Sequence, residues 1–257
     1  MHSGAVISIG DSSQNRTSFL VVGTDTGVGK TVFTGLLAKY MITRGLLTCL
    51  VKPFCSGGKR DIYFLQSVNE ESDQNKINYW YCDKPISPAA WELRTGKLID
   101  SDNMIIRLTR ETERKDCDIL LVEGVGGLLA PITLRHTVAS LGQELGSSII
   151  IIAQNRVGVI NHVLLTVEAA LSRGLSVSSI ILMGQEEPDS SADDNAELIR
   201  IHMPNISNFK GVYEFPWLEE EADNPKLIST NVEKTKEVLG KIFDNVISSS
   251  LVKDLNH

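Results

Sequence analysis

The chain has 257 residues, of which 42 % are hydrophobic, and a formal net charge of −7. This length fits one large α/β domain or two small ones, and the hydrophobic fraction is enough for a sizeable core. The acidic balance argues against a nucleic-acid partner, because nucleic-acid binding needs clustered lysine and arginine.

The lengths of the apolar runs and the arrangement of the cysteines predict the cellular compartment of the protein. No stretch reaches the roughly 18 apolar residues of a membrane-spanning helix, so we expect no membrane partner. Residues 1–17 are polar and lack the apolar segment of a signal peptide, and we expect them to form a flexible N-terminal extension. The four cysteines are scattered without a CxxC pair, as is typical of free thiols in a reducing compartment. A cytoplasmic protein is expected.

Apolar runs alternate with helix-like segments along residues 18–257, which we expect to form one domain. Strands are predicted at 19–22, 46–51, 118–124, 148–153, 179–183 and 209–215. Helices are predicted at 31–44, 61–68, 89–94, 102–114, 138–145, 159–173, 192–202 and 233–247. Residues 69–86 show no clear period and are expected to be mostly loop. Strands separated by helices predict an α/β fold with a mostly parallel central sheet between helical layers.

A glycine-rich stretch joins the first predicted strand to the first helix and reads Gly-Thr-Asp-Thr-Gly-Val-Gly-Lys-Thr from Gly23 to Thr31. The backbone N–H groups of such a loop and the N-terminus of the following helix bind phosphates. Lys30 is placed to bridge the outer phosphates, and the Thr31 hydroxyl to hold Mg²⁺. Five residues separate Gly23 from Gly29, whereas the common loop has four. The stretch predicts a phosphate-binding loop and a P-loop NTPase-like fold.

Charged side chains also follow two other predicted strands. Lys52 opens the sequence Lys-Pro-Phe-Cys-Ser-Gly, and Glu123 precedes a run of glycines. Ligands of parallel sheets bind at the carboxyl ends of strands, where a lysine can neutralise charge on a transferred phosphoryl group. Carboxylate oxygens suit a hard cation, so Glu123 and Asp61 are candidate Mg²⁺ ligands. From position alone, a solvated lysine and ordinary loop carboxylates remain alternatives.

Two further features are weaker signals. The segment 158–162 begins a predicted helix whose N-terminal amides can hold a carboxylate or phosphate, although most helix N-termini bind only water. The aromatic residues between positions 79 and 91 could line a pocket, but core or loop packing is the expected role.

Six motifs occur in the order and spacing of one family. They are the glycine-rich loop at 23–31, Lys-Pro-x-x-Ser-Gly at 52–57, Pro-Ile-Ser-Pro at 85–88, Val-Glu-Gly-Val-Gly-Gly at 122–127, Gly-Val-Ile-Asn-His at 158–162 and Pro-Trp-Leu at 216–218. With them the chain resembles the dethiobiotin synthetases from about residue 18 to 245.

The resemblance implies an ATP- and Mg²⁺-dependent cyclo-ligase of biotin biosynthesis that acts as a homodimer. Such an enzyme carboxylates 7,8-diaminopelargonic acid with CO₂, drawn from bicarbonate, to form the ureido ring of dethiobiotin. One amine captures CO₂ as a carbamate, which attacks the γ-phosphate of ATP to give a carbamic–phosphoric anhydride. The second amine then closes the ring and expels phosphate.

The resemblance also assigns the site. Lys30 and Lys52 would stabilise the carbamate and the transferring phosphoryl group, while Thr26 and Ser56 would hydrogen-bond the substrate or carbamate. The Mg²⁺ ligands would be Thr31, Asp61 and Glu123. The substrate's tail carboxylate would bind, across the dimer interface, to Gly158, Val159, Ile160 and Asn161. The nucleotide would contact Gly27, Val28, Gly29, Lys30, Thr31, Val32, Asp61, Glu123, Gly124, Val125, Gly126, Pro216, Trp217 and Leu218.

Three positions depart from the family pattern. Gly27 replaces a glutamate of many relatives, and Ala89 replaces a histidine that often follows Ser-Pro. Met183 stands where relatives often place an asparagine that reads the adenine edge, and a thioether cannot make that hydrogen-bond pattern. We expect a weakened preference for ATP over other nucleoside triphosphates.

Other readings of the P-loop remain open. A nucleotide-binding switch or partitioning-type ATPase usually carries a second lysine early in the loop, where this chain has Asp25. Lys52 together with Ser56 favours the ligase. A related amide-forming ligase of cofactor synthesis and, because of the three departures, a non-catalytic paralogue are further alternatives.

Overall fold

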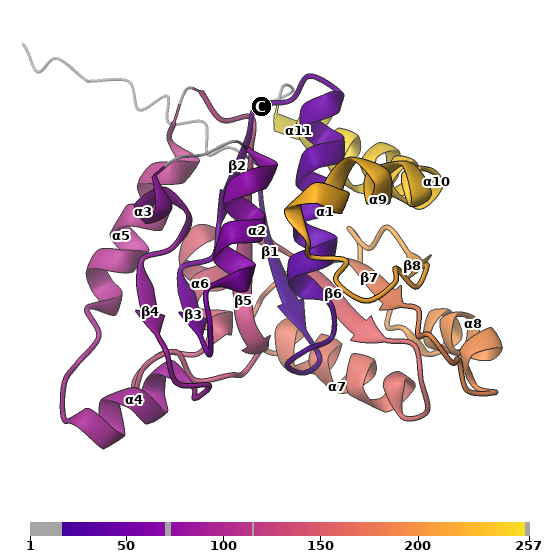
Figure 1. The fold of residues 1–257 in the computed structure, drawn as a ribbon. Helices are drawn as coiled ribbons and strands as arrows, with labels where there is room; N and C mark the ends of the chain where they lie inside the picture. The colour runs from indigo at the N-terminus through magenta and orange to yellow at the C-terminus, as the bar shows by residue number, and fades with distance from the viewer. Residues whose placement is uncertain (1–16, 70–72, 115, 255–257) are drawn as a thin grey trace, which may run out of the picture.

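The computed structural model describes residues 17–69, 73–114 and 116–254. Its main sheet has six strands in the order β2-β5-β1-β6-β7-β8, and all neighbouring strands run parallel (Figure 1). The strands are β1 (Thr17–Gly23), β2 (Thr48–Val51), β5 (Ile119–Gly127), β6 (Ser148–Gln154), β7 (Val177–Met183) and β8 (Val212–Phe215). A second parallel pair is formed by β3 (Phe54–Ser56) and β4 (Trp80–Cys82).

Helices connect the strands and cover both faces of the main sheet. They are α1 (Lys30–Thr43), α2 (Arg60–Val68), α3 (Gln74–Ile77), α4 (Pro88–Thr95), α5 (Ser101–Thr112), α6 (Val138–Leu145), α7 (Val159–Leu171) and α8 (Ala192–His202). The C-terminal part contains α9 (Ile228–Lys234), α10 (Lys236–Ile242), a π-helical segment (Phe243–Ser248) and α11 (Ser249–Asp254).

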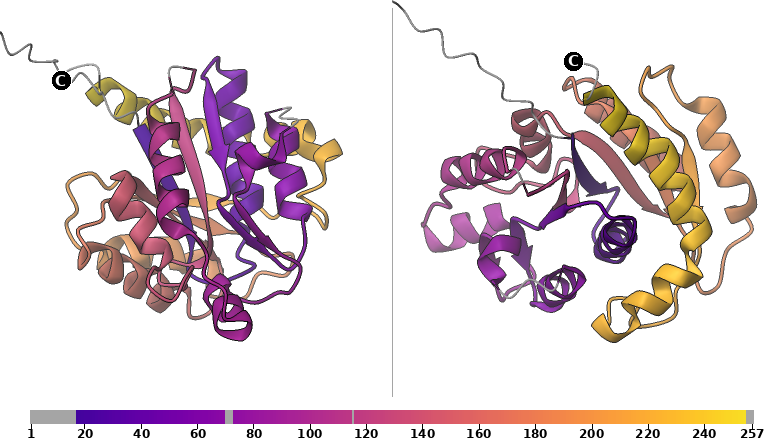
Figure 2. Two further views of the ribbon diagram at one scale, coloured as in Figure 1. Left: turned by 90° about the vertical axis from the view of Figure 1, so that its left-hand side faces the viewer. Right: turned by 90° about the horizontal axis from the view of Figure 1, so that it is seen from above.

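Two apolar clusters separate the three layers. Alternate residues of β1 point to opposite faces, so that Leu20 packs with α5, α6, α7 and α8, whereas Phe19 packs with α1, α2, α9 and α10. Figure 2 shows the sheet between these helical layers. β6 is buried on both faces, which explains its continuous isoleucine run. The predicted three-layer α/β fold with a parallel central sheet is confirmed.

Several local predictions are wrong. Within the described part of residues 69–86, α3 and the short strand β4, which pairs with β3, interrupt the expected loop, although more than half of these residues remain outside helices and strands. The strand predicted at 209–215 begins only at Val212, after Gly211 with a φ of 122°. Thr17, expected in the N-terminal extension, begins β1 instead, and residues 1–16 lie outside the described part of the chain.

The helix predicted at 233–247 is also wrong in extent. Helical structure begins earlier, with a 3₁₀ turn (Pro225–Leu227) that leads into α9, and α9 ends at Lys234. The Thr235 hydroxyl donates to the Asn231 carbonyl at 2.6 Å, a side-chain contact that competes with the regular helical pattern. Among the described residues, no helix is long and apolar enough to cross a membrane.

The packing of α1 against α2 provides a test of the fold. A Cβ atom at Gly35 of α1 would lie 2.4 Å from Cε1 of the buried Phe64, so Gly35→Ala should destabilise the protein by about 1–3 kcal/mol although alanine favours helices. Gly240→Ala is the matched control, because its nearest neighbour would be the Tyr40 hydroxyl at 3.2 Å. Urea unfolding of both variants measures the difference; equal stability would contradict this packing.

Candidate active site

The loop after β1 has the geometry of a phosphate site. Gly27 and Gly29 adopt left-handed conformations with φ of 73° and 95°, and Gly29 caps the N-terminus of α1. A Cβ atom at Gly23 would lie 2.4 Å from the Asp25 carbonyl oxygen, so only glycine permits this close turn. The positive end of the 14-residue helix α1 therefore faces the loop interior.

Lys30 is held inside this loop, and no ion pair joins it to a carboxylate of the described residues. Its Nζ donates to the Asp25 carbonyl at 3.0 Å, and the side chain is buried. Burial is the largest influence and lowers the pKa of Lys30 to about 8. An incoming polyanion would stabilise the ammonium form, so the residue is arranged to bind phosphate.

Lys52, directly after β2, lies between a carboxylate of α2 and a carboxylate of β5. Its Nζ is 2.5 Å from Asp61 Oδ2 and 2.6 Å from Glu123 Oε1. Burial acts to lower the pKa of Lys52, but the two carboxylates outweigh burial and raise it. Burial likewise acts to raise the pKa of Asp61, but the charge and hydrogen bond of Lys52 outweigh it and keep that pKa lowered. Lys52 and Asp61 therefore remain ionised near neutral pH, and Glu123 completes the network.

The oxygen atoms around this network suit Mg²⁺. The Thr31 hydroxyl donates to Glu123 Oε1 at 2.7 Å, and Glu123 Oε2 is buried without a hydrogen-bond partner. The described residues contain no group of three or more His, Cys, Asp or Glu side chains that could hold a metal. Two carboxylates and a hydroxyl nevertheless fit Mg²⁺, which usually takes few protein ligands and completes its shell with phosphate and water.

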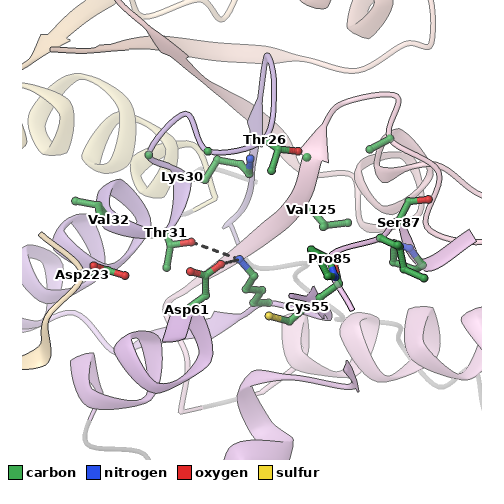
Figure 3. Close-up of a pocket in the computed structure, with 18 of the residues that line it drawn as sticks. Thr26, Lys30, Thr31, Val32, Cys55, Asp61, Pro85, Ser87, Val125 and Asp223 are labelled. Atoms are coloured by element: carbon green, nitrogen blue, oxygen red, sulfur yellow. Dashed lines mark hydrogen bonds and ion pairs between the residues drawn. The ribbon is translucent and has the colours of Figure 1, made fainter. Parts of the chain in front are cut away.

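A cavity of about 420 Å³ opens above the charged network (Figure 3). The P-loop residues Thr26 and Lys30 form one side, and Asp61 lies close to Thr31 at the base. The opposite side comes from the segment before α4 and from the loop after β5. The lining residues are Thr26, Gly27, Gly29, Lys30, Thr31, Val32, Lys52, Cys55, Ser56, Asp61, Pro85, Ile86, Ser87, Pro88, Val125, Gly126, Ala130, Pro131 and Asp223.

A smaller cavity of about 100 Å³ lies on the other side of the P-loop. Gly27, Gly29 and Val32 line both cavities. Its remaining lining is mainly apolar and consists of Val28, Gln154, Met183, Gly184, Gln185, Pro216, Trp217, Leu218 and Ala222. The Gln185 amide nitrogen donates to the carbonyls of Met183 and Gly184 at 3.1 and 3.0 Å, so both of its protons are engaged.

Comparison with known proteins identifies the family. The AAA domain family matches residues 17–223. The ATP-dependent dethiobiotin synthetase of Marinobacter nauticus is 31 % identical over 226 residues, which cover 83 % of this chain and 94 % of the relative. The synthetase of Methanocaldococcus jannaschii is 32 % identical, with coverages of 63 % and 77 %. That of Halalkalibacterium halodurans is 36 % identical, with coverages of 64 % and 71 %.

The chain belongs to the dethiobiotin synthetase family. This membership confirms the resemblance derived from the six motifs and places the chain in a family of enzymes named as ATP-dependent.

The cavities gather most of the residues expected in a dethiobiotin synthetase site. Glu123 lies beneath the large cavity rather than lining it, because its side chain is buried against Lys52. Gly124 lines neither cavity. A Cβ atom there would lie 2.7 Å from Val138 Cγ1, so a glycine at this position allows Val138 to pack closely against the strand. Gly158, Val159, Ile160 and Asn161 begin α7 but line neither cavity, and Val159 packs in the core.

Some residues that line the cavities were not predicted, because no motif in the neighbouring sequence marks them. Asp223 lines the large cavity and forms an ion pair with Arg60 at 2.5 Å, although the two residues are 163 positions apart. Gln154 and Gln185 were not expected in the small cavity. A Cβ atom at Gly27 would meet no atom within 4 Å, so the position of the family's glutamate is open space in this chain.

The charged network generates a prediction about metal binding. The Lys52 ammonium competes with Mg²⁺ for Asp61 and Glu123, and Lys52→Ala removes this competitor while leaving two carboxylates uncompensated. Lys52→Ala should therefore melt at a lower temperature than wild type without Mg²⁺, and MgCl₂ alone should raise its Tm several times more than it raises that of wild type.

Differential scanning fluorimetry across an MgCl₂ series, without nucleotide, measures this effect. Lys39→Ala is the control, because Lys39 contacts the Val68 carbonyl far from both carboxylates. Equal Mg²⁺ responses of wild type and Lys52→Ala would contradict competition at this site.

Proposed function

We propose that the chain is an ATP- and Mg²⁺-dependent cyclo-ligase that converts 7,8-diaminopelargonic acid, CO₂ and ATP into dethiobiotin, ADP and phosphate in biotin biosynthesis. The observation that carries this proposal is the large cavity that joins Lys30, Lys52 and Ser56 to a phosphate-binding loop. A P-loop switch needs no such space for a small substrate beside its phosphates. The cavity therefore favours the ligase over the partitioning-type ATPase.

Each residue has a role that follows from its surroundings. Lys30 and the α1 N-terminus bind the outer phosphates. Lys52 neutralises charge that develops on the carbamate and the transferring phosphoryl group. Thr26 and Ser56 lie in the same cavity and hydrogen-bond the carbamate or the diamine. The small apolar cavity receives the nucleobase between Met183, Trp217 and Leu218.

The reaction needs little covalent chemistry from the protein. One substrate amine adds to CO₂ and loses a proton to give a carbamate, whose oxygen displaces ADP from the γ-phosphorus. The second amine attacks the carbonyl carbon of the resulting anhydride, and phosphate leaves as the ring closes. Held by Thr31, Asp61 and Glu123, Mg²⁺ would screen the charge of the triphosphate. The main contribution of the chain is to hold the reactants in line.

The start of α7 is the proposed site for the tail carboxylate of the diamine. In the described structure no side chain caps this helix, and the Val159 N–H donates to the Arg156 carbonyl at 3.0 Å, so the amides of Ile160 and Asn161 are the proposed donors. Since these residues line neither cavity, the proposal requires a second copy of the chain to bring its own α7 beside the cavity. A cytoplasmic homodimer is therefore part of the proposed function.

Phosphate release tests the function directly. Wild-type protein with Mg²⁺, ATP and bicarbonate should release phosphate many times faster when 7,8-diaminopelargonic acid is added, and mass spectrometry should find dethiobiotin in the product. Diamine-independent hydrolysis would contradict the ligase and support the switch, and no hydrolysis would support the non-catalytic paralogue.

The small cavity predicts relaxed nucleobase selection. Met183 offers only a weak acceptor and the amide protons of Gln185 are engaged, so few side-chain groups remain to distinguish adenine from cytosine. The kcat/KM values for ATP and CTP should agree within about tenfold. Met183→Asn should shift the ratio toward ATP. A preference of about a hundredfold for ATP in wild type would contradict this prediction.

A further inference from the structure

Glu92 is a buried carboxylate outside the site described so far. It lies in α4, and only 3 % of its surface is exposed. Oε1 accepts from the Ile99 N–H at 2.7 Å, and Oε2 accepts from the Leu134 N–H at 2.6 Å. Burying a carboxylate is costly unless it is hydrogen-bonded, so these two bonds are strong constraints on the segments that donate them.

The two donors belong to different segments around the large cavity. Leu134 is in the loop after β5, which contributes Ala130 and Pro131 to the cavity lining. Ile99 is in the connection from α4 to α5. Glu92 itself is one turn after Ser87 and Pro88, which line the same side of the cavity, opposite the P-loop. One side chain therefore ties together the two segments that form this side of the cavity.

The other side of α4 is anchored to the strand that follows Lys52. Trp91 packs edge-on against Trp80 of β4 with ring centroids 5.6 Å apart, and Trp80 packs against Phe54 of β3 at 6.3 Å. Phe54 follows Lys52 by two residues. The loop carrying Ala130 and Pro131 is held to α6 by backbone hydrogen bonds from Val138 and Ala139. Because α4 is fixed by aromatic packing, the hydrogen bond from Leu134 to Glu92 adds the tie that holds this loop against α4.

We propose that Glu92 is a positioning residue that fixes the side of the cavity opposite the P-loop, the side against which the diamine would bind. This inference rests on the proposed function in one respect, the identity of the substrate that occupies the cavity. The P-loop lies between β1 and α1, and the two N–H groups that the Glu92 carboxylate accepts from belong to neither element, so the nucleotide site should be independent of this tie.

Glu92→Gln tests the proposal because it keeps the shape of the side chain but can accept from only one of the two N–H groups. The KM for the diamine should rise about tenfold, while the KM for ATP stays within about twofold of wild type. Hydrogen exchange of the segment 128–137 should become faster, and that of the P-loop should not change.

Ser18→Ala is the matched control, since it removes a buried hydrogen bond to Ser147 at the amino end of β1. It should lower the Tm without altering either KM. If Glu92→Gln does not fold, Glu92→Asp, which retains the charge on a shorter side chain, should give the same split between the two substrates.

Equal increases of the KM values for diamine and ATP, or unchanged exchange at 128–137, would overturn the role of Glu92. If wild-type protein shows no diamine-dependent phosphate release, the proposed function fails, and the exchange experiment decides the inference alone. Faster hydrogen exchange of Glu92→Gln confined to residues 128–137 would then support the positioning role of Glu92. Exchange that is uniformly faster, or unchanged, would refute it.

Discussion

The buried Lys52 ammonium between Asp61 and Glu123 is the interaction on which the rest of the site depends. A buried charge is tolerated only where oppositely charged and hydrogen-bonding groups surround it. β2 pairs with β5 and β5 with β1, so the carboxyl ends of three adjacent strands bring Lys52, Glu123 and the P-loop together. The order of strands in the sheet is therefore a condition for the chemistry as well as for the core.

The two lysines of the site are held in different ways, and the difference fits two roles. Among the described residues, Lys30 donates to a backbone carbonyl of the loop, and burial lowers its pKa, so binding of a triphosphate would stabilise its ammonium form. Lys52 already has two carboxylates, which raise its pKa and hold it ionised. A divalent cation that takes over these carboxylates would free the Lys52 ammonium for the carbamate and the transferring phosphoryl group.

The sequence predicted the parts of the site that depend on local rules. A glycine-rich turn between a strand and a helix is recognisable within nine residues, and Lys52 and Glu123 stand directly at strand ends. Contacts between distant segments left no such signal. The pairing of Arg60 with Asp223, the bonds of Glu92 and the β3–β4 pair all depend on which segments the fold brings together. For the same reason, α3 and β4 were missed within residues 69–86.

The division of labour between the two lysines is the central claim, and one comparison tests it most directly. The dissociation constant for ATP and the single-turnover rate of dethiobiotin formation would be measured for Lys52→Ala and Lys30→Ala. The account predicts that Lys52→Ala binds ATP nearly as well as wild type but reacts at least about a hundredfold more slowly, whereas Lys30→Ala loses ATP binding. A Lys52→Ala variant with an unchanged rate, or with the same loss of ATP binding as Lys30→Ala, would contradict it.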